Sequence, residues 1–309
     1  MKFPLFALIL FTLTALNATP SQAEPPQVVA TIKPIHGLVA AVMDGVGVPD
    51  LLIEGATSPH TLTLRPSDAR KLETADVLVW VGPGLETALA GKLPVLAPRA
   101  HMVELMAAPG INLLAADDDH ADEDHASDPD HGAYDPHIWL APDNARAIVR
   151  AVADALSTRD PANAPRYTAN AKALDQRLQK LAGDIRARLA PVSDVPFAVY
   201  HDAFGYMEQA FGLSSVGHVV IAPERMAGTA HVRALRNTLR DHRVRCLFTE
   251  PQFAPGLAHT VVEGLAIRIA TLDPLGADLP QGPDLYDRLM ERNARSLLDC
   301  LGTPVEGPG

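Results

Sequence analysis

The stretch PRYTANAKALDQRLQKLAGDIRARL, residues 165–189, separates two halves of this chain that have a similar pattern. Its large apolar side chains recur at spacings of three and four residues, which places them on one face of a helix. They are Leu174, Leu178, Leu181, Ile185 and Leu189. We expect a long rigid helix, within a linker at residues 158–192, that joins a domain before it to a domain after it.

Short apolar runs alternate with helical patterns on both sides of this helix. The expected strands are 28–33, 77–82, 197–200, 246–249 and 269–272. The expected helices include 35–46, one that opens at Pro66, and three near 229–242, 256–268 and 284–301. Such alternation is typical of parallel sheets with crossover helices. The predicted fold class is therefore α/β, with an N-terminal domain at 24–157 and a C-terminal domain at 193–309.

The first 23 residues have the composition of a secretory signal peptide. Lys2 precedes an apolar run from Leu5 to Leu16, and Ser21-Gln22-Ala23 supplies small residues for cleavage. The run is too short to cross a bilayer, and Glu24 follows the expected cut where a lipoprotein has a cysteine. We expect export to the periplasm as a soluble monomer without a membrane anchor.

The charge balance is acidic, with 26 Lys and Arg against 37 Asp and Glu and a formal net charge of −11. The densest run of acids lies between Asp117 and Asp130. No basic stripe is present that would neutralise a phosphate backbone, so we do not expect nucleic acid as a partner.

Three polar residues come directly after expected strands of the C-terminal domain: His201, Glu250 and Asp273. Open parallel sheets bind ligands beyond the carboxyl ends of their strands. In the N-terminal domain, His60 and His137 each lie in a loop just before a helix. A single loop histidine is usually a surface group, but this joint pattern predicts that histidines of both domains meet in a cleft.

Three imidazoles suit zinc, which takes nitrogen ligands at roughly 2.0 to 2.1 Å in tetrahedral geometry. A carboxylate or a water molecule would fill the fourth position. The sequence therefore predicts a Zn²⁺ site between the two domains.

Four motifs occur in a fixed order: SPHTLTLRPSD at 58–68, DPHIWLAP at 135–142, YHDAFGY at 200–206 and LDPLG at 272–276. In order and spacing they resemble the solute-binding proteins of bacterial ABC metal importers, the cluster A-I family, and most nearly its zinc-uptake branch. The likeness runs from about Val28 to Cys300. It implies two α/β domains with zinc in the cleft between them, binding without catalysis, and delivery of zinc to a membrane permease.

By that resemblance, His60, His137 and His201 are the imidazole ligands, and Asp273 ligates directly or through water. Manganese- and iron-binding relatives typically have a glutamate at the position of His201, so the histidine favours zinc. Some zinc relatives have a glutamate just before the first histidine, where this chain has Pro59. Proline has no side-chain donor atom, which leaves the fourth place to Asp273 or water.

Glu250 and Asp202 lie near enough to orient a ligand imidazole through its second nitrogen, although either is as well suited to cap a helix. Cys246 and Cys300 are the only cysteines, and in an exported protein they most simply pair. Two buried free thiols are the alternative. The resemblance favours the disulfide, which would clamp the final helix onto the strand before Glu250.

The acidic loop at 116–135 contains His120, His125 and His131 and almost no apolar side chains. Such a composition does not form a packed core, so one interpretation is a solvated loop. The other is that these histidines, with nearby aspartates, hold additional zinc weakly and raise its concentration beside the cleft. His218, in VGHVVIAPER at 216–225, is a further candidate donor.

Three competing functions have to be weighed. A zinc hydrolase also uses three histidines and a water, but the chain lacks H-E-x-x-H and G-x-S-x-G motifs, and Glu250 is its only candidate base. A manganese- or iron-binding protein of the same fold is a closer rival. A surface adhesin is disfavoured by the missing lipid-anchor cysteine.

Overall fold

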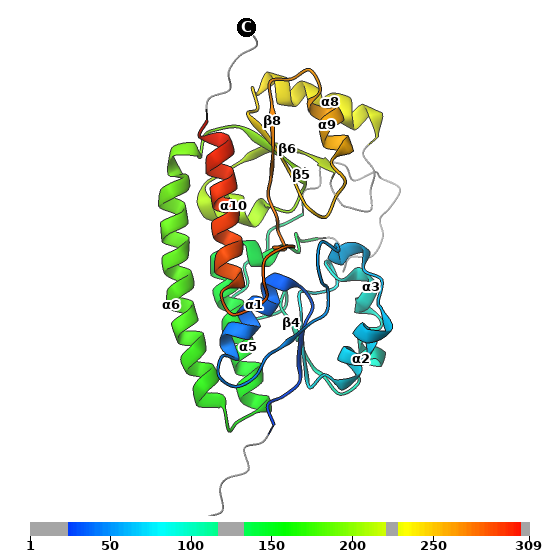
Figure 1. Cartoon of the computed structure of the whole chain (residues 1–309), viewed down its shortest axis with the longest axis vertical. Coiled ribbons are helices and arrows are strands. Elements are labelled where there is room, and N and C mark those ends of the chain that lie inside the picture. Colours follow the sequence, from blue (N-terminus) through cyan, green and yellow to red (C-terminus); the bar gives the residue numbers. More distant parts are fainter. Residues whose placement is uncertain (1–23, 117–132, 221–227, 304–309) are drawn as a thin grey trace, which may run out of the picture.

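The computed structural model describes residues 24–116, 133–220 and 228–303 of the chain (Figure 1). The expected signal peptide, at 1–23, and His120, His125 and His131 lie outside these residues. Within the described ranges, no helix has both the length and the apolar composition that a membrane crossing requires.

The N-terminal lobe is built on a parallel sheet with the strand order β2-β1-β3-β4. Its strands are β1 (Val28–Ala30), β2 (Asp50–Leu51), β3 (Val77–Trp80) and β4 (His101–Glu104). Its helical segments are α1 (Lys33–Val42), η1 (Pro59–Thr61), α2 (Pro66–Thr74), α3 (Thr87–Ala90), α4 (Leu93–Leu96), η2 (Ile138–Leu140) and α5 (Pro142–Arg159). The central strands β1 and β3 are buried along their whole length, as their continuous apolar composition predicts.

The C-terminal lobe repeats this topology with the strand order β6-β5-β7-β8, again all parallel. Its strands are β5 (Phe197–His201), β6 (Ser215–Val220), β7 (Cys246–Thr249) and β8 (Arg268–Thr271). Its helices are α7 (Gly205–Phe211), α8 (Thr229–Asp241) and α9 (Gly256–Val262). The predicted α/β fold with two parallel sheets is confirmed.

The expected long helix is α6 (Ala164–Leu189), which runs beside both lobes and is continued by η3 (Ala190–Val192) (Figure 1). All five apolar residues that predicted its buried face are buried. A turn at residues 160–163 separates α6 from the end of α5. The division of the chain into domains at 157 and 192 stays a prediction.

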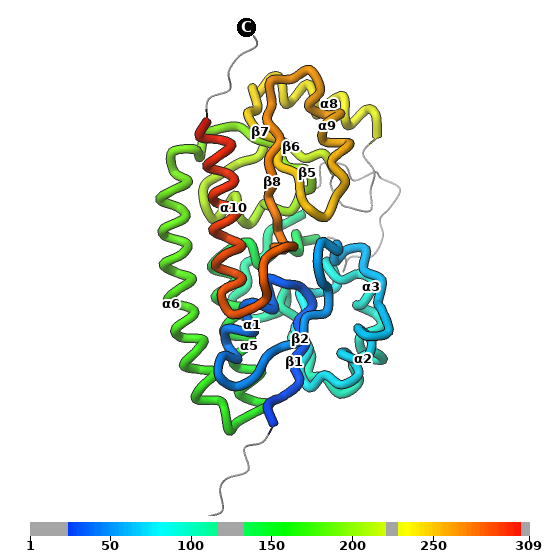
Figure 2. The backbone as a smooth tube through the Cα atoms, in the orientation of Figure 1, coloured from blue at the N-terminus to red at the C-terminus, as the bar shows by residue number. Residues whose placement is uncertain are grey.

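A second helix, α10 (Leu285–Leu301), also spans the two lobes. The segment after β8 descends to the N-terminal lobe, and α10 then returns along α6 (Figure 2). A Cβ atom on Gly37 of α1 would lie 3.0 Å from the Leu285 Cβ atom, so the absence of a side chain lets the two helices approach closely here. Tyr286 donates a hydrogen bond of 2.8 Å to the Trp139 carbonyl oxygen. One hydrophobic core therefore continues from the first lobe into the second.

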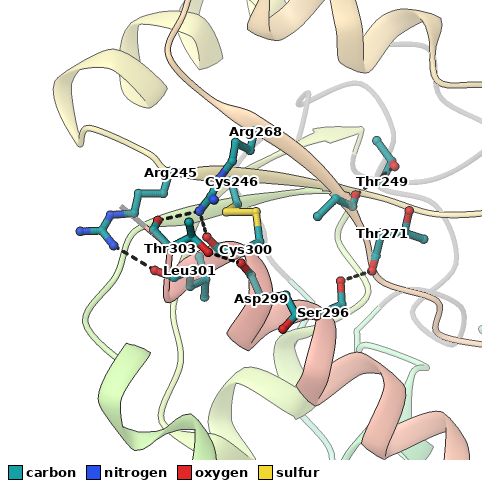
Figure 3. The surroundings of a disulfide bond; sticks show 11 residues. Arg245, Cys246, Thr249, Arg268, Thr271, Ser296, Asp299, Cys300, Leu301 and Thr303 are labelled. Atoms are coloured by element: carbon teal, nitrogen blue, oxygen red, sulfur yellow. Dashed lines mark hydrogen bonds between the residues drawn. A yellow bond between two sulfur atoms is a disulfide. The ribbon is translucent and has the colours of Figure 1, made fainter. Parts of the chain in front are cut away.

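The predicted disulfide between Cys246 and Cys300 is confirmed and joins the start of β7 to the end of α10 (Figure 3). The Arg268 guanidinium donates to the carbonyl oxygens of Cys300 and Thr303. Arg245 donates to the carbonyl oxygen of Leu301 at 2.9 Å. The last turn of the chain's final helix is thus fastened to the C-terminal sheet at several points.

Candidate metal site

His60 lies in η1, in the connection that follows β2. Pro59 occupies the first position of η1, where a missing backbone N–H costs nothing. The Thr87 hydroxyl, at the start of α3, donates a hydrogen bond of 3.3 Å to the His60 carbonyl oxygen. The backbone of this histidine is therefore anchored to a neighbouring helix of the same lobe.

His137 lies in the connection between β4 and α5, immediately before η2. The Asp135 carboxylate accepts two hydrogen bonds from it, from the backbone N–H at 2.9 Å and from Nδ1 at 2.7 Å. Because Nδ1 donates to this carboxylate, the neutral ring carries its lone pair on Nε2. This is the tautomer that binds a metal through Nε2.

His201 is the last residue of β5, and Glu250 follows β7 in the same sheet. The His201 Nδ1 atom lies 3.5 Å from a Glu250 carboxylate oxygen, just beyond hydrogen-bond contact. Both side chains are buried, and within the described residues neither His201 Nδ1 nor Glu250 Oε1 has a hydrogen-bond partner. The rings of Phe253 and His201 pack in a T-shaped arrangement with 5.7 Å between their centroids.

The structure brings His60, His137 and His201 together across the boundary between the lobes. Ring nitrogens of the three residues lie within 4.8 Å of one another, and the Nε2 atoms of His60 and His137 are 3.4 Å apart. Tetrahedral zinc with bonds of roughly 2.0 to 2.1 Å holds its nitrogen ligands about 3.3 Å apart. The spacing of the first two imidazoles therefore fits an edge of such a tetrahedron.

The space bordered by these three histidines is small, about 10 Å³. Apolar side chains, including Trp139 and Leu275, form much of its wall. Larger surface grooves of about 670 and 640 Å³ lie elsewhere on the C-terminal lobe, and none of the three histidines lines them. The histidine site has room for an ion and not for an organic substrate.

The pKa of His60 is lowered to about 2, chiefly by burial and to a smaller extent by the neighbouring rings of His137 and His201. A proton on His60 would lose its hydration and repel any charge on the other two rings. The metal-free protein therefore holds His60 neutral and ready to bind a cation.

Asp273, which with water was one of the two candidates for the fourth position, is buried but makes other contacts. Its carboxylate accepts hydrogen bonds from the backbone N–H groups of Leu275 at 3.0 Å and Ala277 at 2.6 Å, and from the Gln252 side chain at 3.1 Å. Its own N–H donates to Asn293. Within the described residues, the group of converging ligand atoms contains the three histidines and not Asp273. In this structure its carboxylate stabilises the turn after β8.

The remaining candidates lie outside the three-histidine group. Asp202 directly follows His201, and its backbone N–H donates to the Val220 carbonyl oxygen at 3.3 Å. His218 lies on β6, its ring stacked on the ring of His231 with 6.1 Å between centroids. A His231 ring nitrogen lies 3.1 Å from the His218 carbonyl oxygen. The ligand-orienting role of Asp202 and the metal-binding role of His218 stay predictions.

Asp135, whose carboxylate accepts the hydrogen bond from the His137 ring, was not among the expected site residues. The signal was present, because Asp135 stands two residues before His137 inside the motif DPHIWLAP. Ligand histidines commonly donate their second ring N–H to a carboxylate, so an acid at this short distance was a candidate orienting group.

Comparisons with known proteins agree with this geometry. Residues 28–300 match the family model described as zinc-uptake complex component A, periplasmic, or ZnuA. The high-affinity zinc uptake system protein ZnuA of Brucella abortus (strain 2308) is 40% identical over 308 residues, covering 90% of this chain and 92% of that protein. The protein of the same name from Yersinia pestis is 33% identical over 301 residues, covering 93% and 94%.

A crystal structure of a ZnuA protein shares the fold, with a TM-score of 0.76 at 20% identity over 90% of this chain and 99% of that one. The family match covers both lobes and all three converging histidines. The chain belongs to the ZnuA family of periplasmic zinc-uptake components.

Proposed function

We propose that this protein binds Zn²⁺ in the periplasm through His60, His137 and His201 and delivers it to the membrane permease of an ABC importer. The observation that carries the proposal is the convergence of three imidazoles from two lobes within 4.8 Å. Membership of a zinc-uptake family supports it. Export through residues 1–23 would bring the protein to that compartment.

The donor set favours zinc over manganese or iron. Imidazole nitrogen suits zinc, whereas manganese prefers carboxylate and carbonyl oxygens. Within the described residues, the converging group contains no carboxylate oxygen, and the residue before His60 is a proline. Three neutral nitrogens do not offset the positive charge of the ion. Nearby carboxylates that do not contact the ion would offset that charge instead.

Water is the simplest fourth ligand. The Asp273 carboxylate already accepts hydrogen bonds from the N–H groups of Leu275 and Ala277, and a move toward the ion that broke them would leave buried donors without partners, which is costly. We keep direct ligation by Asp273 as the alternative, reached by a rearrangement of the turn after β8.

Glu250 is the proposed orienting partner of His201. When His201 binds zinc through Nε2, its proton must sit on Nδ1, which faces the Glu250 carboxylate at 3.5 Å. A small inward shift on binding would form that hydrogen bond and satisfy Nδ1, which has no other partner within the described residues. His201 would then match His137, which already donates to Asp135.

The protein works by binding and release, as a transport component and not as an enzyme. The small volume at the histidines leaves no room for an ester or peptide substrate. Release follows when docking on the permease changes the spacing of the three ligands.

His120, His125, His131 and His218 are proposed as auxiliary, weaker zinc ligands. Three of them belong to a segment whose many aspartates would offset the charge of a bound cation. Deletion of residues 117–131 should lower the zinc stoichiometry in calorimetry and leave one tight site. An unchanged stoichiometry would reject the auxiliary role without touching the main site.

Single alanine variants test the main site. Replacing His60, His137 or His201 should raise the zinc dissociation constant at least about 100-fold. Loss of a group that only hydrogen-bonds to a metal ligand already lowers metal affinity by about 10- to 100-fold, and loss of the ligand itself should cost more. His242→Ala, an exposed histidine after α8, is the matched control and should bind normally. Competition with a chromophoric chelator gives the constants, and elemental analysis after exposure to mixed metals identifies the preferred ion. Wild-type affinity in all three variants would refute the site.

A further inference from the structure

Tyr206 connects the two lobes next to the metal site. It lies on α7 of the C-terminal lobe and is 2% exposed. Its hydroxyl accepts a hydrogen bond of 3.0 Å from the Leu114 N–H and donates one of 2.9 Å to the Asp135 carbonyl oxygen. Both partners belong to the N-terminal lobe, in the connection between β4 and η2.

Leu114 and Asp135 lie on two short stretches that pair with each other. The Asp135 N–H donates to the Leu114 carbonyl oxygen at 3.0 Å, and Ala115 and Tyr134 form an antiparallel bridge. One tyrosine hydroxyl thus holds both stretches at once, because it bonds to one residue of each.

Asp135 receives a second set of contacts through its side chain. Its carboxylate accepts both hydrogen bonds from His137, the backbone N–H and Nδ1. A Cβ atom on Gly205, the first residue of α7, would lie 3.4 Å from the other carboxylate oxygen. The start of α7 therefore packs directly against the group that orients His137.

The same segment of the C-terminal lobe carries another of the proposed ligands. β5 ends at His201, the Ala203 N–H donates to the His201 carbonyl oxygen at 2.9 Å, and α7 begins at Gly205. Five residues after His201, Tyr206 reaches across to the backbone of Asp135. A continuous path of covalent and hydrogen bonds therefore joins His201 in one lobe to His137 in the other.

We propose that Tyr206 is a positioning residue, which fixes the segment of His201 against the carboxylate that orients His137 and so sets the spacing of these ligands before zinc arrives. This inference rests on the proposed zinc-binding function. Burial raises the pKa of Tyr206 to about 12, so its hydroxyl keeps the proton that it donates. In a preformed site the ligands are already ordered, so less conformational entropy is lost when zinc binds.

Tyr206→Phe tests the proposal, because it removes the hydroxyl and keeps the buried ring. The zinc dissociation constant should rise about 10-fold, the lower end of the range for groups that orient metal ligands. Zinc should also dissociate faster into excess chelator. In the metal-free protein, ¹⁵N NMR of the His137 ring should change from one fixed Nδ1–H tautomer to an exchanging mixture.

Tyr167→Phe is the matched control. Tyr167 is also fully buried, and its hydroxyl donates to the Asp160 carboxylate at 2.8 Å in the turn region between α5 and α6. The control should lose stability and leave both the zinc constants and the His137 NMR signals unchanged. Asp135→Asn combined with Tyr206→Phe should weaken zinc by less than the product of the single effects, because both act through one path.

Wild-type zinc constants and an unchanged His137 tautomer in Tyr206→Phe would overturn the inference. Equal zinc weakening in Tyr167→Phe would also overturn it, since the effect would then follow general loss of packing. If His137→Ala weakens zinc and Tyr206→Phe does not, only the inference fails. If His137→Ala itself binds zinc normally, the proposed function fails.

Discussion

The Lys33 ammonium group donates hydrogen bonds to the carbonyl oxygens of Ala277 at 2.9 Å and Leu279 at 2.6 Å. Lys33 begins α1 in the N-terminal lobe, whereas its partners lie in the segment after β8. Pro274 and Leu275, in the same segment, border the three histidines. A buried lysine of one lobe therefore holds a wall of the metal site that comes from the other.

Lys33→Met should lower the free energy of unfolding of the metal-free protein by about 1–3 kcal/mol, because two carbonyl oxygens lose a buried donor. Urea denaturation measures the change. Lys172→Met, which alters an exposed lysine of α6, is the control and should stay within about 0.5 kcal/mol of wild type. Equal stability of the two variants would show that the Lys33 contacts contribute nothing.

The stability of the metal-free protein should fall as the pH drops from about 6.5, and His60 is one cause. Its pKa is about 2 in the folded protein and 6.5 when unperturbed, so between these values only the unfolded chain binds a proton there. The stabilisation is complete above pH 6.5 and is lost progressively toward pH 2. One such proton changes the free energy of unfolding by up to about 1.4 kcal/mol per pH unit.

His60→Asn should flatten that dependence, because asparagine does not titrate. Urea denaturation in a chelator, repeated from pH 7 to pH 4, gives the slope for each protein. His242→Ala removes an exposed histidine and should keep the wild-type slope. A slope in His60→Asn as steep as in wild type would contradict the assignment.

Glu250→Gln should weaken zinc binding by about 10- to 100-fold, since it removes the proposed acceptor for the His201 Nδ1–H. The metal-free variant should be at least as stable as wild type, because the substitution removes a buried carboxylate with an unpaired oxygen. Chelator competition and urea denaturation give the two values. Glu263→Gln, at an exposed site in the same lobe, is the control. Normal zinc affinity in Glu250→Gln would show that Glu250 does not orient His201 for zinc binding.

Reduction of the Cys246–Cys300 disulfide should destabilise the protein without changing the zinc affinity of the folded form. The bond closes a separation of 54 residues, which the chain-entropy model equates with about 4 kcal/mol. It lies at the amino end of β7, whereas Glu250 and the metal site lie at the carboxyl end. Urea denaturation with and without reductant measures the loss, and a Cys246→Ala/Cys300→Ala variant should not respond to reductant.

The sequence predicted the parts of the fold whose signals are local. The apolar face of α6 and the buried runs of β1, β3, β5 and β7 have the periodicity of their structures. β2, β4 and β6 were missed because they are very short or only partly buried, and such strands depend on their neighbours. The return of α10 to the N-terminal lobe also has no local signal, since it is settled by tertiary packing.

The residues of the candidate site also divide into those whose role the sequence predicted and those whose role it left open. His60, His137 and His201 follow strands or precede helices, so the expected topology predicted that histidines of both domains meet in a cleft, and the family resemblance named these three as the ligands. Asp273 shares that position, but a carboxylate at a strand end can bind a metal or accept backbone N–H groups in a turn. The sequence does not distinguish the two, whereas the contacts with Leu275 and Ala277 do.

The packing of Leu285 on Gly37 has a consequence for the order of folding. The first lobe to leave the ribosome completes its core only when the last helix of the chain has been made, because α10 covers α1. Contacts between such distant residues form late and slow the search for the native state. In a chain with this topology, α1 stays without this partner until the residues of α10 have been synthesised.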